Sequence, residues 1–151
     1  MNKNNELIRK YFEENSLVKS NIESFNYFVE KGMVEIVQEI GDIIPTIIPP
    51  EMEDFRIKLD KLEVEKPSLT EADGSKRDIY PSEARLRKLS YSAPVHLNVS
   101  VHVDGIQRET FKAQIGKIPV MVKSKYCHLS SLPREKIIEK GEDPDDPGGY
   151  F

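Results

Sequence analysis

The basic side chains of two short segments are the residues whose types and spacing are best suited to chemistry with phosphates. In EARLRKL, Arg85 and Lys88 are three residues apart, so they share one side of a predicted helix as a basic ridge, and Arg87 adds a third cation. Leu86 and Leu89 are expected to point the other way, into the core. The alternative is an exposed or interface-forming helix whose arginines pair with carboxylates of a neighbouring chain.

Two lysines in MVKSKYCHL form the second basic segment. Lys123 and Lys125 are two residues apart at the end of a predicted strand, so both project to one side, toward a backbone phosphate. Solubility of the surface explains them equally well. Arg85, Arg87, Lys88, Lys123 and Lys125 are therefore candidates for contact with a nucleic-acid backbone or another protein chain.

The cysteine and histidines do not combine into a site. Cys127 and His128 can both bind zinc, but a structural zinc site needs about four ligands and the sequence has no second pair. As nucleophile and base they would point to opposite faces of an extended segment, which favours a buried structural thiol. His96 and His102 lie about 20 Å apart along a strand, too far to share one metal ion, and are expected to be exposed.

The acidic, glycine-rich end EDPDDPGGYF is predicted to be a solvated loop. Asp143, Asp145 and Asp146 lack the spacing of a calcium loop. Gly148 and Gly149 lack the preceding strand and following helix of a phosphate-binding loop. With no serine elbow or acid–base pair elsewhere, we expect no catalytic residue, no metal site and no cofactor in this chain.

Composition bounds the remaining possibilities. A chain of 151 residues that is 38% hydrophobic can fill one core, so a single domain is expected. The net charge of -4 repels polyanions and argues against an autonomous, sequence-independent DNA-binding protein. The single cysteine suits a reducing compartment. Neither a signal peptide nor an apolar run of about 20 residues is found, so we expect an intracellular protein outside the membrane.

Two helices are predicted at the amino terminus. Apolar residues recur every three or four positions from Ile22 to Ile40, which predicts an amphipathic helix with Ser20 and Glu23 as its capping box. Gly41 and Pro45 are expected to end it. A shorter helix is predicted at about 5–14. Its expected buried side consists of Leu7, Ile8, Tyr11 and Phe12.

The remainder alternates like β-structure. A strand from Phe55 to Val64 changes phase at Asp60 and Lys61, which predicts a bulge, and a strict alternation from Val95 to Val103 predicts a strand with one wet face. Three further elements follow. The first is a hairpin at Asp104 and Gly105 with a return strand over 108–115. The second is a strand over 118–122 with Pro119 at an edge or strand start. The third is a helix over 131–140 that ends at Gly141. Glu71 to Gly74 reads as a turn, followed by a helix that starts at Tyr80 and Pro81, where Glu83 suits the positive end.

Several long motifs, in order, resemble the amino-terminal part of the second-largest subunit of cellular multisubunit DNA-directed RNA polymerase, in its archaeal or eukaryotic form. They are SFNYF at 24–28, KPSLTEADG at 66–74, YPSEARLRKLSYSAP at 80–94, IPVMVKSKYCHLS at 118–130 and DPGGYF at 146–151. In that family DPGGYF continues into an INGxE-type segment. We therefore expect residues 1–151 to be an amino-terminal fragment that forms part of one domain, the protrusion, with an unpaired sheet edge that invites self-association.

The resemblance implies an α+β fold, with an antiparallel or mixed sheet on which the amino-terminal helices pack. It also implies a noncatalytic role as one wall of the DNA cleft in an enzyme that synthesises RNA, whose catalytic Mg²⁺ is held by another subunit. Implied partners are the other subunits, including the largest, together with DNA, a general initiation factor and an elongation factor. The compact loop after Val103 favours an archaeal, cytoplasmic protein over a eukaryotic, nuclear one. Two alternatives are an independent nucleic-acid-binding module and a stand-alone enzyme that uses Cys127.

Overall fold

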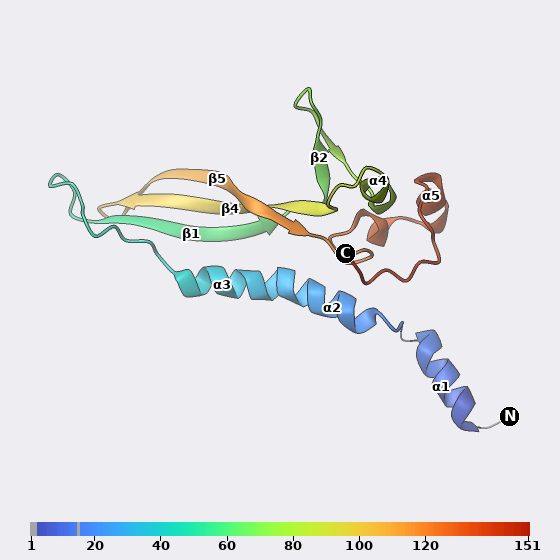
Figure 1. Ribbon diagram of the computed structural model, residues 1–151. Helices are drawn as coiled ribbons and strands as arrows, with labels where there is room; N and C mark the ends of the chain where they lie inside the picture. The colour runs from blue at the N-terminus through green and yellow to red at the C-terminus, as the bar shows by residue number, and fades with distance from the viewer. Residues whose placement is uncertain (1–2, 15) are drawn as a thin grey trace.

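Strand β4 (Ser92–Val103) is the centre of the fold. In this computed structural model, which describes residues 3–14 and 16–151, β4 pairs antiparallel with β1 (Phe55–Val64) on one side and with β5 (Ile106–Pro119) on the other. These described strands form a three-stranded sheet in the order β1-β4-β5 (Figure 1). The expected α+β class is confirmed, and the sheet is antiparallel.

Two local features of the sheet agree with the sequence. The register between β1 and β4 shifts between Leu59 and Lys61, as the change of phase predicted. Asp104 and Gly105 connect β4 to β5 with φ angles of 52° and 76°, the positive values of a tight two-residue hairpin turn. The Asp104 carboxylate also accepts hydrogen bonds from the backbone N–H groups of Glu53 and Asp54, at 2.8 and 2.9 Å, so the hairpin turn holds the start of β1.

The separate strand expected over 118–122 is wrong. β5 stays paired with β4 as far as Pro119, opposite Ser92, so the return strand is longer than predicted and Pro119 lies at the end of an edge strand. Beyond it the chain turns inward. Val120 N–H donates to Tyr91 O at 2.9 Å and Val122 N–H to Tyr150 O at 2.8 Å, and these residues are buried without joining the sheet.

The long predicted helix exists, but its details differ. It runs through α2 (Lys19–Tyr27), a π-helical turn (Phe28–Gly32) and α3 (Met33–Ile40), and it stops at Gly41 with φ of 67°. The capping box is wrong, because the helix begins earlier and its N-cap, Val18, makes no side-chain cap bond. The π turn shifts the helical phase, so Ile36 and Ile40 are 52% and 59% exposed although they continue the apolar spacing.

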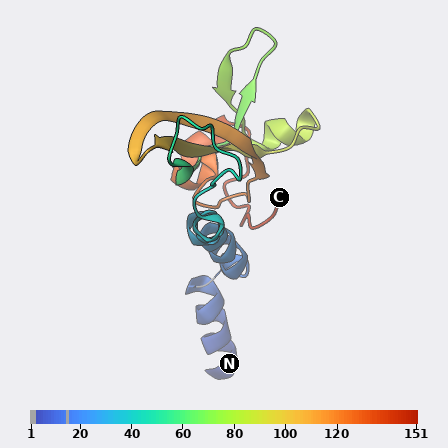
Figure 2. The same cartoon turned by 90° about the vertical axis from the view of Figure 1, so that its left-hand side faces the viewer.

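Helix α1 (Lys3–Glu14) forms where it was expected but does not bury its apolar side. Leu7, Ile8, Tyr11 and Phe12 are all exposed. Figures 1 and 2 show the reason: α2 and α3 run along the sheet, whereas α1 extends away from it. Helical periodicity predicts a helix with one apolar side, but it does not specify whether another element covers that side.

The segment between β1 and β4 contains a hairpin that the sequence analysis missed. β2 (Ser68–Thr70) and β3 (Lys76–Asp78) pair around the predicted turn, where Gly74 has φ of 85°. The hairpin projects from the body beside α4 (Pro81–Leu86), which starts with proline in its first turn as predicted (Figure 1). The predicted last helix is confirmed as α5 (Arg134–Glu139), which follows Pro133 and ends before Gly141 with φ of 76°. It is shorter than predicted, and a 3₁₀ turn (His128–Ser131) precedes it.

The core consists of two adjoining clusters. The larger joins α4, the start of β4 and the irregular segment 120–129, and its buried members are Ile79, Ala84, Tyr91, Ala93, Val120, Val122, Cys127 and Leu129. The smaller joins the long helix to the same segment through Phe25, Val29 and Met121. Val64 and Tyr126 pack against both clusters, so one continuous core results.

The glycine pair near the carboxyl end passes through a narrow gap. Gly148 has φ of 69°, and a Cβ there would lie 2.5 Å from Val122 O. Gly74 also has positive φ but has open space around it. We therefore expect Gly148→Ala to lower the free energy of unfolding by about 3 kcal/mol, because strain and a backbone clash combine.

The matched control is Gly74→Ala, which introduces backbone strain alone and should cost about 1 kcal/mol. Urea unfolding followed by circular dichroism measures both values. Equal losses for the two variants would show that the close approach at Val122 has no energetic weight.

Candidate functional site

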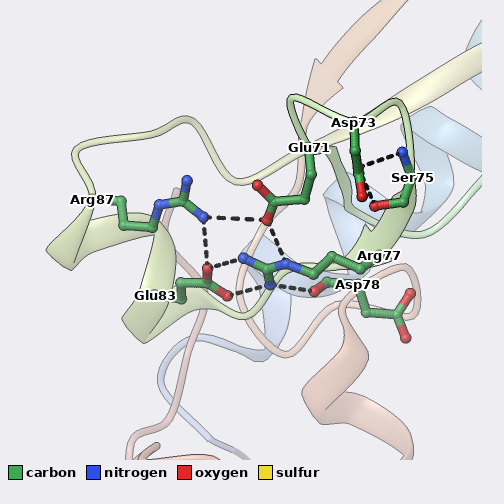
Figure 3. A network of polar contacts seen from close by, with 7 residues as sticks. All are labelled: Glu71, Asp73, Ser75, Arg77, Asp78, Glu83 and Arg87. Carbon is green, nitrogen blue, oxygen red and sulfur yellow. Dashed lines mark hydrogen bonds and ion pairs between the residues drawn. The ribbon is translucent and has the colours of Figure 1, made fainter.

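A network of ion pairs joins the β2–β3 hairpin to α4. The guanidinium of Arg77 donates to Glu71 at 2.6 Å and to both carboxylate oxygens of Glu83, and it also donates to the backbone O of Asp78 (Figure 3). Arg87 donates to Glu83 from the other side at 3.0 Å. The hydrogen bonds from Arg77, and then those from Arg87, lower the pKa of Glu83 to about 2.

Arg87 therefore uses its charge within the chain. Its guanidinium lies 3.0 Å from Glu83 and 3.7 Å from Glu71, both of which also contact Arg77. Glu83, which was expected to stabilise the start of α4, acts mainly as the shared acceptor for two arginines. Arg77 was not singled out from sequence, although the turn at Glu71 to Gly74 could have signalled a hairpin that brings Arg77 back toward Glu71.

Arg85 covers a buried carboxylate. The guanidinium donates to the Tyr150 hydroxyl at 2.9 Å and lies 3.4 Å from Glu142, whose side chain is only 3% exposed. The other oxygen of Glu142 accepts from Ser82 N–H at 2.6 Å, so a residue distant in sequence supplies the N-terminal cap of α4. The hydrogen bond to Tyr150 raises the pKa of Arg85.

The end of α4 differs from the expected basic ridge. The helix stops at Leu86, and Lys88 follows in the left-handed conformation with φ of 54°, so it does not continue the helical side of Arg85. The expected burial of the two leucines is also wrong, because Leu86 is 85% exposed and Leu89 38% exposed. The spacing rule assumes that the helix continues past both leucines, whereas α4 has only six residues and ends at Leu86.

Lys123 and Lys125 lie in a turn and contact different segments of the chain. Lys123 has a backbone φ angle of 62°. Its ammonium donates to the carbonyls of Pro144 and Asp146. Lys125 instead pairs with Glu30 on the long helix. The expectation that both lysines project to one side of a strand end is therefore wrong.

The motifs that carry the family likeness contact one another. Asn26 of SFNYF accepts a hydrogen bond from Lys125 N–H at 3.0 Å, and Phe25 packs edge-to-face on Phe151 of DPGGYF with ring centroids 5.6 Å apart. Gly149 N–H donates to Val122 O at 2.9 Å. Three motifs spread over the whole chain thus meet at one junction.

A second junction lies in the core around Cys127. The buried Tyr91 hydroxyl donates to Cys127 Sγ at 3.3 Å and accepts from His128 N–H at 3.1 Å. His128 Nε2 donates to Pro67 O at 2.8 Å, so KPSLTEADG also joins this network. The prediction of a buried structural thiol is confirmed, and burial raises the pKa of Tyr91.

The histidines of β4 are less exposed than expected. His102 Nε2 lies 3.1 Å from the hydroxyl of Ser100, which is itself buried. The side chain of His96 is only 14% exposed, with Nδ1 3.3 Å from Glu65 but outside hydrogen-bond geometry.

Asp145, which the sequence places in a solvated loop, forms a two-pronged ion pair with Arg134 at 2.7 and 2.8 Å.

In the described part of the chain, no group of three or more His, Cys, Asp or Glu side chains is arranged to hold a metal ion. The described helices also include none that is long and apolar enough to cross a membrane. The polar contacts above join segments of the chain to one another. Together with the fold, they define an α+β structure whose segments are joined by polar contacts.

The family of this chain follows from comparison with known proteins. The sequence model of the RNA polymerase beta subunit matches residues 16–151, nearly the whole chain. The chain therefore belongs to the RNA polymerase beta subunit family, in which it corresponds to the amino-terminal region of the archaeal second subunit.

Relatives in archaea agree with this assignment. The chain is 44% identical over 150 residues to the DNA-directed RNA polymerase subunit Rpo2N of Methanocaldococcus jannaschii and 45% identical over 148 residues to that of Methanothermobacter thermautotrophicus. It is 40% identical over 146 residues to subunit Rpo2 of Sulfolobus acidocaldarius. The matches cover 96–97% of this chain but only 29%, 27% and 12% of these relatives.

The depressed pKa of Glu83 predicts a pH dependence of stability. An unfolded glutamate titrates near 4.5, whereas Glu83 in the fold titrates near 2, so its ion pairs stabilise the fold above about pH 4.5 and are lost as the pH falls toward 2. We expect Glu83→Gln to flatten the loss of stability in this window, as measured by urea unfolding at a series of pH values.

Glu63 requires a parallel variant, because hydrogen bonds from Lys112, and then Lys61, lower its pKa to about 2 as well. Glu63→Gln separates the two contributions. An unchanged pH profile in Glu83→Gln would contradict the role of the arginine network.

The buried tyrosine hydroxyl supports a second prediction. Tyr91→Phe leaves the buried His128 N–H without its acceptor and removes one of the two donors to the Cys127 sulfur, so we expect a loss of about 2 kcal/mol in the free energy of unfolding. Tyr80→Phe is the matched control, since it keeps the ring that packs against His128. If the two variants were equally stable, the hydroxyl of Tyr91 would contribute nothing to the core.

Proposed function

We propose that this chain acts as a structural part of DNA-directed RNA polymerase, as the protrusion wall beside the DNA cleft, and contributes no catalytic residue. The observation that carries the proposal is the convergence of the family motifs. Asn26, Tyr91 and Tyr150, each from a different motif, all contact the segment 122–128. These contacts support a structural role for the residues that carry the likeness.

In the assembled enzyme, we propose that the reaction is template-directed transfer of nucleotides by metal-assisted in-line displacement. In this proposal, the largest subunit holds the catalytic Mg²⁺. The partners proposed for this chain are the other subunits, DNA and the general initiation and elongation factors. An archaeal protein of this kind acts in the cytoplasm, and the isolated chain is inactive.

The five basic residues remain proposed contacts with phosphate or with another subunit. They differ in how far their charged groups already have partners within the chain. Arg87, Lys123 and Lys125 contact acceptors of the chain itself, and Arg85 is shared between Tyr150 and Glu142. The ammonium of Lys88 has no partner among the residues described. A high-affinity nucleic-acid-binding module needs several available cations, so these contacts support the scaffold over the alternative of an independent module.

Reconstitution tests the proposal. We expect the 151-residue chain alone to incorporate no nucleotide on a primed template and to bind duplex DNA weakly, with an affinity that falls steeply as salt rises. A chimera that places residues 1–151 into the Methanocaldococcus jannaschii subunit should assemble with the remaining subunits and synthesise RNA.

The same assay with the chain omitted gives the baseline. Tight, sequence-selective binding of DNA by the chain alone at physiological salt would favour the independent module. Failure of the chimera to assemble, while the natural subunit assembles in parallel, would refute the structural role.

A further inference from the structure

Glu65 links the β2–β3 hairpin to the three-stranded sheet. It follows the end of β1, and its backbone N–H donates to Pro94 O at 3.1 Å. One carboxylate oxygen, Oε2, accepts a hydrogen bond from Lys76 of β3 at 2.6 Å. The other, Oε1, lies 3.4 Å from the ammonium of Lys112 on β5 and 3.3 Å from Nδ1 of His96 on β4. Side chains from three strands therefore meet at one carboxylate.

The contact between His96 and Glu65 is the one in this group that changes character with pH. The side chain of His96 is only 14% exposed, and its Nδ1 is buried without a hydrogen bond to any residue described. In the neutral tautomer with its proton on Nε2, the lone pair of Nδ1 faces a carboxylate oxygen, so two acceptors oppose each other. Protonation makes Nδ1 a charged donor, and the same 3.3 Å separation then becomes an attractive ion pair.

The two glutamates nearest His96 keep their charge while a histidine titrates. The charged groups that face this part of the sheet are Lys61, Glu63, Glu65, Lys76 and Lys112, and the residue opposite His96 on β5 is the neutral Gln114. A hydrogen bond from Lys112 is the main cause that lowers the pKa of Glu63 to about 2, and one from Lys76 lowers the pKa of Glu65. Both carboxylates therefore stay ionised from about pH 5 to 8, where histidine changes charge.

The hairpin has two further attachments to the body. Arg77 binds Glu83 of α4, and the pKa of about 2 keeps this carboxylate ionised over the same range. At the base of the hairpin, His128 Nε2 lies 2.8 Å from Pro67 O and 3.8 Å from the carboxylate of Asp78. A response of the hairpin to pH between 5 and 8 therefore has two candidate origins among the three histidines of the chain, His96 and His128.

We propose that His96 is a pH-sensitive clamp, whose protonation fixes the β2–β3 hairpin to the sheet through Glu65 and whose deprotonation loosens it. Protonated His96 takes Oε1 while Lys76 keeps Oε2, so one carboxylate joins β4 directly to β3. Lys112 is free to leave Oε1, because its ammonium also contacts Glu63 at 2.9 Å. The hairpin projects from the body, so the clamp sets how rigidly it is held (Figure 1). This inference goes beyond the proposed function and does not depend on it, since the clamp is made of contacts within the chain.

NMR of the ¹³C,¹⁵N-labelled 151-residue chain between pH 8 and pH 5.5 tests the clamp. We expect the side-chain carboxyl carbon of Glu65 to shift with the same midpoint as the ring resonances of His96. The backbone order parameters of residues 68–78 should rise by about 0.1 as the pH falls, on a scale where a rigid backbone gives about 0.85. His102, which contacts the Ser100 hydroxyl near the far end of β4, is the reference histidine in the same sample.

Two variants separate the clamp from other effects of pH. His96→Gln keeps a polar side chain that cannot gain a charge, and Glu65→Gln removes the charge with which the imidazolium pairs. In each variant, the change in order parameter over residues 68–78 should fall below about one third of the change in the natural chain. His102→Gln is the matched control and should keep the full change. The variants alter different partners, and the titration of the natural chain requires neither.

Three results would overturn the proposal. The first is a Glu65 carboxyl resonance that does not follow the ring of His96. The second is hairpin order that is equal at pH 8 and pH 5.5, or that decreases as the pH falls. The third is a hairpin response that persists in His96→Gln and follows the ring of His128, which would assign it to the contacts at the base of the hairpin.

Discussion

The structure depends on pairing the buried backbone groups of one irregular segment. Residues 120–129 are largely buried but have no continuous strand to pair with, and an unpaired backbone group in a core is costly. Their partners come from distant parts of the chain, including Asn26, the hydroxyl of Tyr91 and the carbonyl of Tyr150. The helix, the sheet and the carboxyl-terminal segment are therefore held to one hub, and each is needed for the others to pack.

The same constraint explains how the charged residues are used. A chain that is 32% charged has many carboxylates to pair with its cations, and the fold brings several together across long stretches of sequence. Glu142 is the clearest case, because it caps α4 while Arg85 covers it. Ion pairs between exposed side chains add little stability individually. Their main effect here is to orient the β2–β3 hairpin and the acidic loop relative to the body.

Several apolar and strand-edge surfaces of the chain are left uncovered by the hub. One side of α1 is apolar and exposed, and β5 is an edge strand whose second edge is not paired with any described strand. Exposed surfaces of this kind support the proposed role of the chain as a structural part of a larger enzyme.

Much of the local structure was predictable because it depends on neighbours in sequence. Alternation predicted β4, the change of phase predicted the bulge in β1, and Asp104 with Gly105 predicted the hairpin. The motifs also identified the family. The roles of the basic residues were not predictable, because the acceptors of Arg85 and Lys123 lie more than 20 residues away and are brought close only by the core.

By itself, the sequence determined most of the segments that become helix or strand, though not the β2–β3 hairpin, and it determined the family to which they belong. Backbone preference, periodicity and ordered motifs are properties of the chain. Only the tertiary structure decided which apolar sides are covered and which charges are neutralised. The exposed Leu86 and the paired Arg87 show the difference. The physical reason is that burial and ion pairing depend on distances between segments, and those distances exist only once the hub has assembled.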